Sequence, residues 1–288
     1  MGTPEVIETG SGLDWQFANA HFSQTSLMVF GLLALIVIAG IVVPKRQRPE
    51  RPQVKRLQAR AEREPENAFA QKALGYAYFD NGDYEAAIGS FEATLALEPD
   101  WNAVRVDLAT ACQRAGDLGM AVYHYKEALG HEPQHAPALY DLATILHKEG
   151  QFTEAQALYM KALGVVTDPG LQLRIDHGLA RVYLDQDDCS MAITLLQALL
   201  TATPSYSRAR TDLASAFGRL GQPEDAIREC QTVLAGEPQN ALALLNLGVA
   251  YKTLHRTGDA KAAFQQAQEA TDDPAVLAKV EAGLAVLE

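Results

Sequence analysis

The amino-acid sequence predicts an all-α protein, an α-solenoid of helical hairpins preceded by one transmembrane helix. Three observations predict this fold class. A single apolar run near the N-terminus is long enough to cross a bilayer as a helix. A Leu followed by Gly or Ala returns six times at a nearly constant interval, which is typical of stacked helical repeats. No segment alternates apolar and polar residues as a half-buried strand would.

The first predicted element is a transmembrane helix over residues 26–44, which follows a short acidic tail over residues 1–25. Its centre, Leu27–Val43, has seventeen residues and no charged side chain, so as a helix it extends about 26 Å, close to the ~30 Å hydrocarbon core of a bilayer. A cleaved signal peptide would need a basic start and an Ala-x-Ala site, whereas the residues before this run are acidic and no convincing site follows it. A buried helix of a soluble core is the other alternative, but such a helix does not need apolar residues on every face, as this run has. We therefore predict that the chain contacts the lipid bilayer through Leu27–Val43.

The second element is a basic juxtamembrane segment with a partial helix, over residues 45–67. Residues 45–66 contain eight Lys and Arg and four acidic residues, whereas residues 1–44 contain no Lys or Arg. Because basic residues resist translocation, this asymmetry predicts an N-terminus outside and a cytoplasmic body. The same basic residues suit contact with anionic lipid head groups, and a topology signal alone is the alternative role.

The third element consists of six helical repeats over residues 68–274. The repeated Leu recurs at spacings of 34, 34, 37, 34 and 34 residues, an Ala stands thirteen residues after each Leu, and a Pro lies near the end of each unit. Small residues let the two helices of a hairpin approach closely. One hairpin cannot bury its apolar side alone, so neighbouring hairpins stack. The predicted units are residues 68–101, 102–135, 136–169, 173–206, 207–240 and 241–274.

Three features depart from this regularity. The spacing of 37 places three additional residues around Pro169–Gln172, where we predict a local kink in the solenoid. A Gly marks the turn inside most hairpins, because Gly adopts the left-handed conformation that ends a helix, but the fourth unit has Asp187 there. In the sixth unit, the pair Gly258-Asp259 predicts a turn shifted to just before Ala260. Residues 275–288 are predicted to form a C-terminal capping helix.

The segment LGYAYFDNGDYEAAIGSFEATLALEP of the first unit resembles the tetratricopeptide repeat (TPR), and the resemblance extends over all six units. It implies a right-handed superhelix with a concave groove lined by the first helix of each repeat. The whole chain resembles bacterial membrane-anchored TPR proteins that assist membrane machinery. This resemblance implies a single-pass protein of the bacterial inner membrane.

The family geometry implies which side chains face the groove: those two positions before and after the repeated Leu, and those one turn earlier. We expect the following residues to bind a partner there: Lys72, Tyr76, Tyr140, Arg174, His177, Arg181, Arg208, Leu242 and Leu245. Because Arg binds carboxylates through paired hydrogen bonds, we predict a protein partner with an acidic segment. Alternatively, these arginines bridge repeats by pairing with Asp176, Asp212 or Glu229.

The charge and cysteine content exclude several other classes of protein. The 288 residues include 24 Lys and Arg and 36 Asp and Glu, a formal net charge of −12. Neutralising phosphates needs the opposite sign, so we predict no nucleic-acid partner. Cys112, Cys189 and Cys230 are too far apart for a disulfide framework or a Cys-x-x-Cys zinc site, and we interpret them as buried thiols in a reducing compartment.

No group of residues in the sequence indicates catalysis. There is no Gly-rich phosphate loop after a strand, and Ser, His and Asp residues are not placed as a triad. Pro133 interrupts the run of His124, His131 and His135, so these three cannot share one helical face as zinc ligands would. We predict a protein that is not an enzyme and has no catalytic residue, metal or cofactor.

The predicted function is that of a membrane-anchored adaptor or scaffold, which binds a protein partner in its groove and supports assembly or regulation of a membrane-associated complex. The alternatives are a docking receptor for protein targeting and a non-catalytic subunit of an enzyme complex. Self-association through the ends of the solenoid stays open.

Overall fold

The computed structural model describes residues 52–287, which belong to the second of two units, Arg51–Glu288. The predicted transmembrane helix over residues 26–44 and the tail over residues 1–25 lie outside the described residues. Among the helices of residues 52–287, none combines the length and the apolar composition that crossing a membrane requires. These residues form fourteen α-helices and no strand, which confirms the predicted all-α solenoid.

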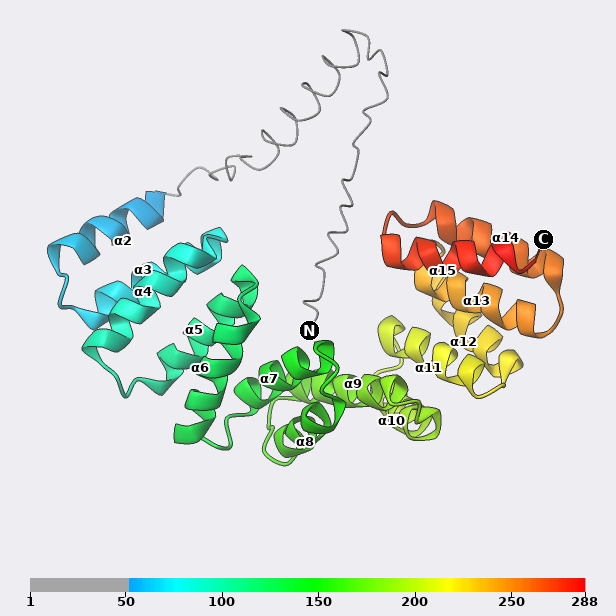
Figure 1. Cartoon of the computed structure of the whole chain (residues 1–288), viewed down its shortest axis with the longest axis horizontal. Helices are drawn as coiled ribbons and strands as arrows, with labels where there is room; N and C mark the ends of the chain where they lie inside the picture. Colours follow the sequence, from blue (N-terminus) through cyan, green and yellow to red (C-terminus); the bar gives the residue numbers. More distant parts are fainter. Residues whose placement is uncertain (1–51, 288) are drawn as a thin grey trace, which may run out of the picture. The chain divides into compact units, whose positions relative to one another are not determined.

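Six helix pairs follow one another in chain order (Figure 1). They are preceded by α2 (Pro52–Arg63) and followed by α15 (Pro274–Ala285), which lie where the partial helix and the capping helix were predicted. The first helices of the pairs are α3 (Ala68–Asn81), α5 (Asn102–Ala115), α7 (Ala136–Lys148), α9 (Pro169–Asp185), α11 (Ser207–Arg219) and α13 (Ala241–Thr253). The second helices are α4 (Tyr84–Leu97), α6 (Leu118–His131), α8 (Phe152–Leu163), α10 (Cys189–Ala202), α12 (Pro223–Gly236) and α14 (Thr257–Glu269).

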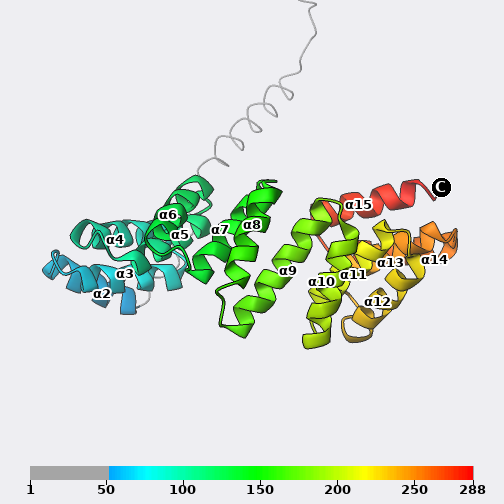
Figure 2. The same cartoon turned by 90° about the horizontal axis from the view of Figure 1, so that it is seen from below.

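Each helix packs mainly against its neighbours in the sequence, as a second view also shows (Figure 2). In addition, α7 contacts α9, α9 contacts α11, α11 contacts α13, and α13 contacts α15. The first helices therefore lie next to one another as a layer. We call the solvent-exposed side of this layer the first-helix face.

Glycine allows the closest helix contacts in the core. A Cβ added at Gly75 would lie 2.6 Å from the ring of Phe91, which is why the residue after this repeated Leu is a Gly. One at Gly178 would lie 2.8 Å from the ring of Tyr159. The ring of Phe264 is in contact with two glycines, Gly248 of its own repeat and Gly283 of α15, each with a hypothetical Cβ 2.6 Å away. The capping helix is thereby held tightly against the sixth repeat.

The turn inside every helix pair has the same register. It contains a residue with positive φ eight positions after the repeated Leu: Gly82, Gly116, Gly150, Asp187, Gly221 and His255. The prediction of a shifted turn at Gly258-Asp259 is therefore wrong, because Gly258 lies inside α14 and His255 adopts a φ of 56°. The left-handed conformation is strained for a residue with a Cβ.

Replacing His255 by Gly is expected to stabilise the protein by about 1 kcal/mol, because Gly adopts positive φ without that strain. Gly221→Ala, at the equivalent turn of the fifth repeat, is the matched control and should destabilise by a similar amount. Chemical denaturation followed by circular dichroism measures both changes. If His255→Gly lowered the stability, the strain argument would be wrong.

The three additional residues of the fourth repeat extend a helix. Helix α9 has 17 residues, whereas the other first helices have 13 or 14. It begins with Pro169, before the predicted start of the repeat at residue 173, and the Asp168 side chain accepts a hydrogen bond from the Leu171 amide. Pro suits this first helical position because its missing N–H would be unpaired there anyway. The segment in which we predicted a kink is thus the capped first turn of α9.

The second repeat has two polar side chains, Arg105 and His124, at positions where the fifth repeat has an ion pair. In the fifth repeat, Arg210 bonds the Glu229 carboxylate at 2.6 Å and the Pro204 carbonyl at 2.9 Å. The equivalent residues of the second repeat are Arg105, which bonds the Pro99 carbonyl at 2.8 Å, and His124. Here the Arg105 Nη1 and His124 Nε2 atoms are buried, and neither has a hydrogen-bond partner among the described residues.

Acidification is expected to destabilise the protein through His124. Burial lowers the pKa of His124, and the charge of Arg105 lowers it further, whereas Glu92 acts in the opposite sense. Below pH ~6.5 the unfolded chain therefore binds a proton at this residue more readily than the folded chain, so stability falls as the pH falls. Repeats three and four have a Leu at the position equivalent to His124, namely Leu158 and Leu195. His124→Leu introduces the same residue and should remove this pH-dependent loss of stability. The difference in unfolding free energy between the two proteins, measured from pH 7 to pH 5, checks this. A difference that does not change with pH would contradict it.

Candidate functional site

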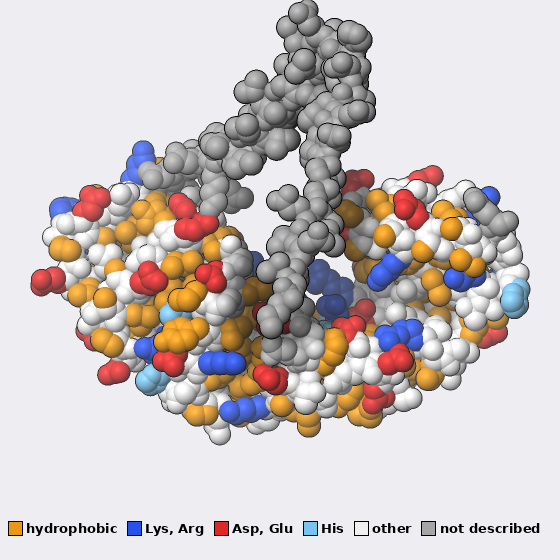
Figure 3. Space-filling view, in the orientation of Figure 1, with side chains coloured by type: hydrophobic (Ala, Val, Ile, Leu, Met, Phe, Trp, Pro, Cys, Tyr) orange, Lys and Arg blue, Asp and Glu red, His pale blue; other side chains and the backbone are white. Residues whose placement is uncertain are grey.

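The residues predicted to bind a partner lie on the first helices, and most of them reach the first-helix face. Arg174, Arg181 and Arg208 are exposed, as are Tyr76 and Leu242, whereas Lys72, Tyr140 and His177 are half-buried. Leu245 is only 5% exposed and packs in the core near α15, so it offers almost no surface. Figure 3 shows blue Lys and Arg side chains in the hollowed middle of one face, between areas rich in hydrophobic side chains.

Aromatic side chains dominate the part of the face nearest to α2. The rings of Phe69 and Trp101 meet edge-to-face with their centroids 4.9 Å apart, and Phe69 is 67% exposed. The Lys72 Nζ atom lies 4.0 Å from the Trp101 ring centroid, a cation–π contact. The Tyr76 hydroxyl donates a hydrogen bond to Asp107. Burial and this carboxylate raise the pKa of Tyr76, so the hydroxyl stays protonated. This part of the face offers aromatic surface, with its polar groups already paired.

Three arginines occupy the middle of the face. The Arg174 guanidinium lies 5.0 Å above the Tyr140 ring centroid. The Arg181 Nε atom is 4.0 Å from an Asp212 oxygen, and the Arg181 side chain is 55% exposed. Within residues 52–287, neither Arg174 nor Arg208 has a carboxylate at ion-pair distance. Stacking on an aromatic ring leaves the N–H groups at the guanidinium edge available.

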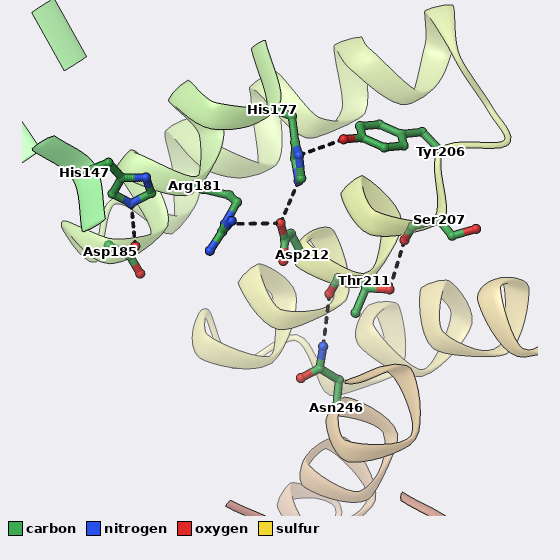
Figure 4. A network of polar contacts seen from close by, with 9 residues as sticks. All are labelled: His147, His177, Arg181, Asp185, Tyr206, Ser207, Thr211, Asp212 and Asn246. Carbon is green, nitrogen blue, oxygen red and sulfur yellow. Dashed lines mark hydrogen bonds and ion pairs between the residues drawn. The ribbon is translucent and has the colours of Figure 1, made fainter. Parts of the chain in front are cut away.

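A polar network joins the fourth repeat to its neighbours (Figure 4). The His177 Nε2 atom is 2.8 Å from the Asp212 carboxylate, and its Nδ1 atom is 3.0 Å from the Tyr206 hydroxyl. With Nε2 protonated, the imidazole donates to the carboxylate and accepts from the phenol. The Asn246 amide donates to the Thr211 carbonyl at 3.0 Å. His177 therefore bridges repeats, whereas Arg174 and Arg208 have no carboxylate at ion-pair distance within residues 52–287.

Sequence reasoning missed one register that helps to form this face. The residue directly before the repeated Leu is Asp107, Asp141, Asp212 or Asn246 in four of the repeats, and each contacts the preceding repeat. Burial raises the pKa of Asp141, although Arg174 and a hydrogen bond from Tyr125 oppose the shift. A polar residue recurring beside a buried Leu is the signal that could have identified this register.

The described residues do not assemble a metal site. Across residues 52–287, no group of three or more His, Cys, Asp or Glu side chains could hold a metal ion. All three cysteines, in the same part of the chain, are unpaired and buried.

Several solved structures share this fold. The chain is 22% identical to PilW, a widely conserved type IV pilus biogenesis factor, over 74% of this chain and 98% of PilW, with a TM-score of 0.64. A tetratricopeptide repeat protein from Parabacteroides merdae is 17% identical over 91% and 98% of the two chains, with a TM-score of 0.62. YrrB, a TPR protein with an unusual peptide-binding site, is 18% identical over 67% and 97%, with a TM-score of 0.53. No curated protein matches the chain.

Family models of the tetratricopeptide repeat match residues 68–101, 113–169, 177–227 and 218–282. Together these matches cover well over half of the sequence and include part of every helix pair. They agree with the helical hairpins, their common turn register and the stacking of one pair on the next. The chain belongs to the tetratricopeptide repeat family.

Proposed function

We propose that this protein is a membrane-anchored, non-catalytic adaptor that binds a segment of a partner protein along its first-helix face. One observation carries this proposal: the face combines exposed aromatic and apolar side chains with two arginines, Arg174 and Arg208, that have no carboxylate at ion-pair distance within residues 52–287. Such groups provide the anchors and the charge-assisted hydrogen bonds on which protein recognition depends. We also propose that the bound segment is acidic, because Arg174, Arg181 and Arg208 place positive charge in the middle of the face.

The anchor in this proposal is Leu27–Val43, with the basic residues that follow it. Helix α2, which begins nine positions after Val43, carries Lys55, Arg56, Arg60 and Arg63, while the whole chain has a net charge of −12. Basic residues beside a membrane segment favour the cytoplasmic side, and we place the repeats in the cytoplasm of a bacterial cell on this ground. Tethering confines the face to the membrane surface, which raises its effective concentration for membrane-associated partners.

Photo-crosslinking in intact cells tests the adaptor. A photoreactive amino acid at Val249, which is 37% exposed on α13, should crosslink to one or two proteins of a membrane complex. The same group at Met191, which is 41% exposed on the second helix α10, is the matched control and should not capture them. Equal capture from both positions would contradict a site on the first-helix face.

A docking receptor for protein targeting is the second candidate, and the unusual peptide-binding site of YrrB is the observation that favours it. A receptor would crosslink weakly to many unrelated proteins from Val249, whereas an adaptor would capture few strongly. The anchor has a separate test, since alkaline washing should leave the full-length chain in the membrane. Release by that treatment would contradict the anchor and leave the binding face unaffected.

A further inference from the structure

We propose that Arg174, Arg208 and Leu242 form a recognition row for an extended peptide. The row accepts two acidic side chains three positions apart, with an apolar side chain three positions further on. This inference rests on the proposed function, because it describes the partner segment that the first-helix face binds.

The three residues share one register on three consecutive first helices. Each stands five positions before the repeated Leu of its repeat, on α9, α11 and α13. These helices are in direct contact, α9 with α11 and α11 with α13. Equivalent positions on adjacent helices therefore lie side by side across the face, in the order Arg174, Arg208, Leu242.

The two arginines of the row, Arg174 and Arg208, differ in their partners from four other arginines in repeats five and six. Arg210, Arg219 and Arg256 each have a carboxylate oxygen within 2.7 Å, and Arg228 bonds to Asp225. Arg174 and Arg208 are exposed and, in the part of the chain that the structure describes, take part in no hydrogen bond or ion pair with a side-chain oxygen. The Arg174 guanidinium instead makes a cation–π contact with the Tyr140 ring, which leaves N–H groups at its edge available.

The Asp212 carboxylate on the same face already has partners. The Asp212 oxygen accepts from His177 at 2.8 Å and lies 4.0 Å from Arg181. Asp141 is half-buried, and the charge of Arg174 lowers its pKa against the effect of burial, but the two groups are not at ion-pair distance within residues 52–287. A carboxylate from another protein therefore does not have to displace an internal ion pair from Arg174 or Arg208.

The spacing of the row fits an extended peptide. Packed helices are about 10 Å apart. An extended chain in the polyproline II conformation rises about 3.1 Å per residue with about three residues per turn, so three residues span roughly that distance and every third side chain points the same way. A peptide crossing from α9 to α13 thus presents one side chain to each helix every third residue. Leu242, which is 48% exposed, provides the apolar contact at the end of the row.

Peptide binding to the full-length protein in nanodiscs tests the row by fluorescence anisotropy. The probe is a labelled dodecapeptide containing Glu-x-x-Glu-x-x-Leu, made in both sequence directions, with Ser and Gly at the other positions. The comparison peptides have the same composition with adjacent Glu residues, or Gln in place of Glu. We expect the better of the two spaced peptides to bind at least tenfold more tightly than either comparison peptide at low salt.

Arg174→Gln and Arg208→Gln should each weaken the spaced peptide at least fivefold and leave the melting temperature unchanged. Arg228→Gln, an exposed arginine on the second helix α12, is the matched control and should bind as the parent does. Equal binding of the spaced and adjacent-Glu peptides, or an equal loss with Arg228→Gln, would overturn the row. If no peptide binds but Val249 still crosslinks to a partner, the row is wrong and the proposed function stands. If peptides bind as expected but the crosslinks are absent, the row stands and the adaptor proposal fails.

Discussion

Replacing Phe264 by Ala is expected to lower the unfolding free energy by about 3–5 kcal/mol, the usual cost of removing a fully buried aromatic ring. The Phe264 side chain is 0% exposed and fills the space between Gly248 and Gly283. No neighbouring side chain can occupy this space easily, because glycines have none to contribute. Urea denaturation followed by circular dichroism measures the loss.

Phe69→Ala is the matched control for this prediction, because Phe69 is 67% exposed. It should change the unfolding free energy by less than about 1 kcal/mol. Hydrogen exchange provides a second readout: in Phe264→Ala the amides of α15 should lose protection before those of α5. Protection that falls equally in both helices would contradict a local role for the ring.

Introducing Asp at Gly178 is expected to destabilise the protein by about 2–3 kcal/mol, the cost of overpacking a core. Comparison among the repeats suggests the opposite, because Asp107, Asp141 and Asp212 occupy the same register. At Gly178, however, a Cβ would lie 2.8 Å from the Tyr159 ring and 2.9 Å from its hydroxyl. Chemical denaturation measures the change.

A double-mutant cycle with Tyr159→Leu assigns the effect of Gly178→Asp to this contact. If the Tyr159 ring causes the clash, Gly178→Asp should cost much less in the Tyr159→Leu background than in the parent. Asn246→Asp provides a control for the acidic residue itself, because Asn246 occupies the same register and has room for a side chain. Additive costs in the cycle would show that the strain lies elsewhere.

The spacing of the repeated Leu was sufficient to predict the helix pairs, because one period of 34 residues accounts for two helices and two turns. It was not sufficient at His255, where residue type pointed to Gly258 and the constant register of the fold placed the turn three residues earlier. Stacking fixes the position of the turn relative to the repeated Leu. A poor turn residue is therefore tolerated where a shifted turn would misalign a whole helix.

The sequence predicted on which helices the candidate site residues lie, but not which side chains they bond to. Register placed Arg174, Arg181 and Arg208 on the first helices, and all three are exposed there. It could not show that His177 is held between Asp212 and Tyr206, because those residues belong to the next repeat. Leu245 also stands at a position predicted to face the groove, but it packs near α15 and is a core residue. Contacts between repeats depend on side chains that the sequence separates by about one period.

The contact of Gly283 with Phe264 reproduces that of Gly178 with Tyr159, and the likeness between the two helices extends further. Helices α9 and α15 both begin with Pro after a capping Asp, and both place a Gly before a Leu, at Leu179 and Leu284. Leu74, Leu179 and Leu284 are separated by 105 positions each, the length of three repeats. Helix α15 therefore has the register of a first helix, and it covers the sixth repeat as the first helix of a seventh repeat would.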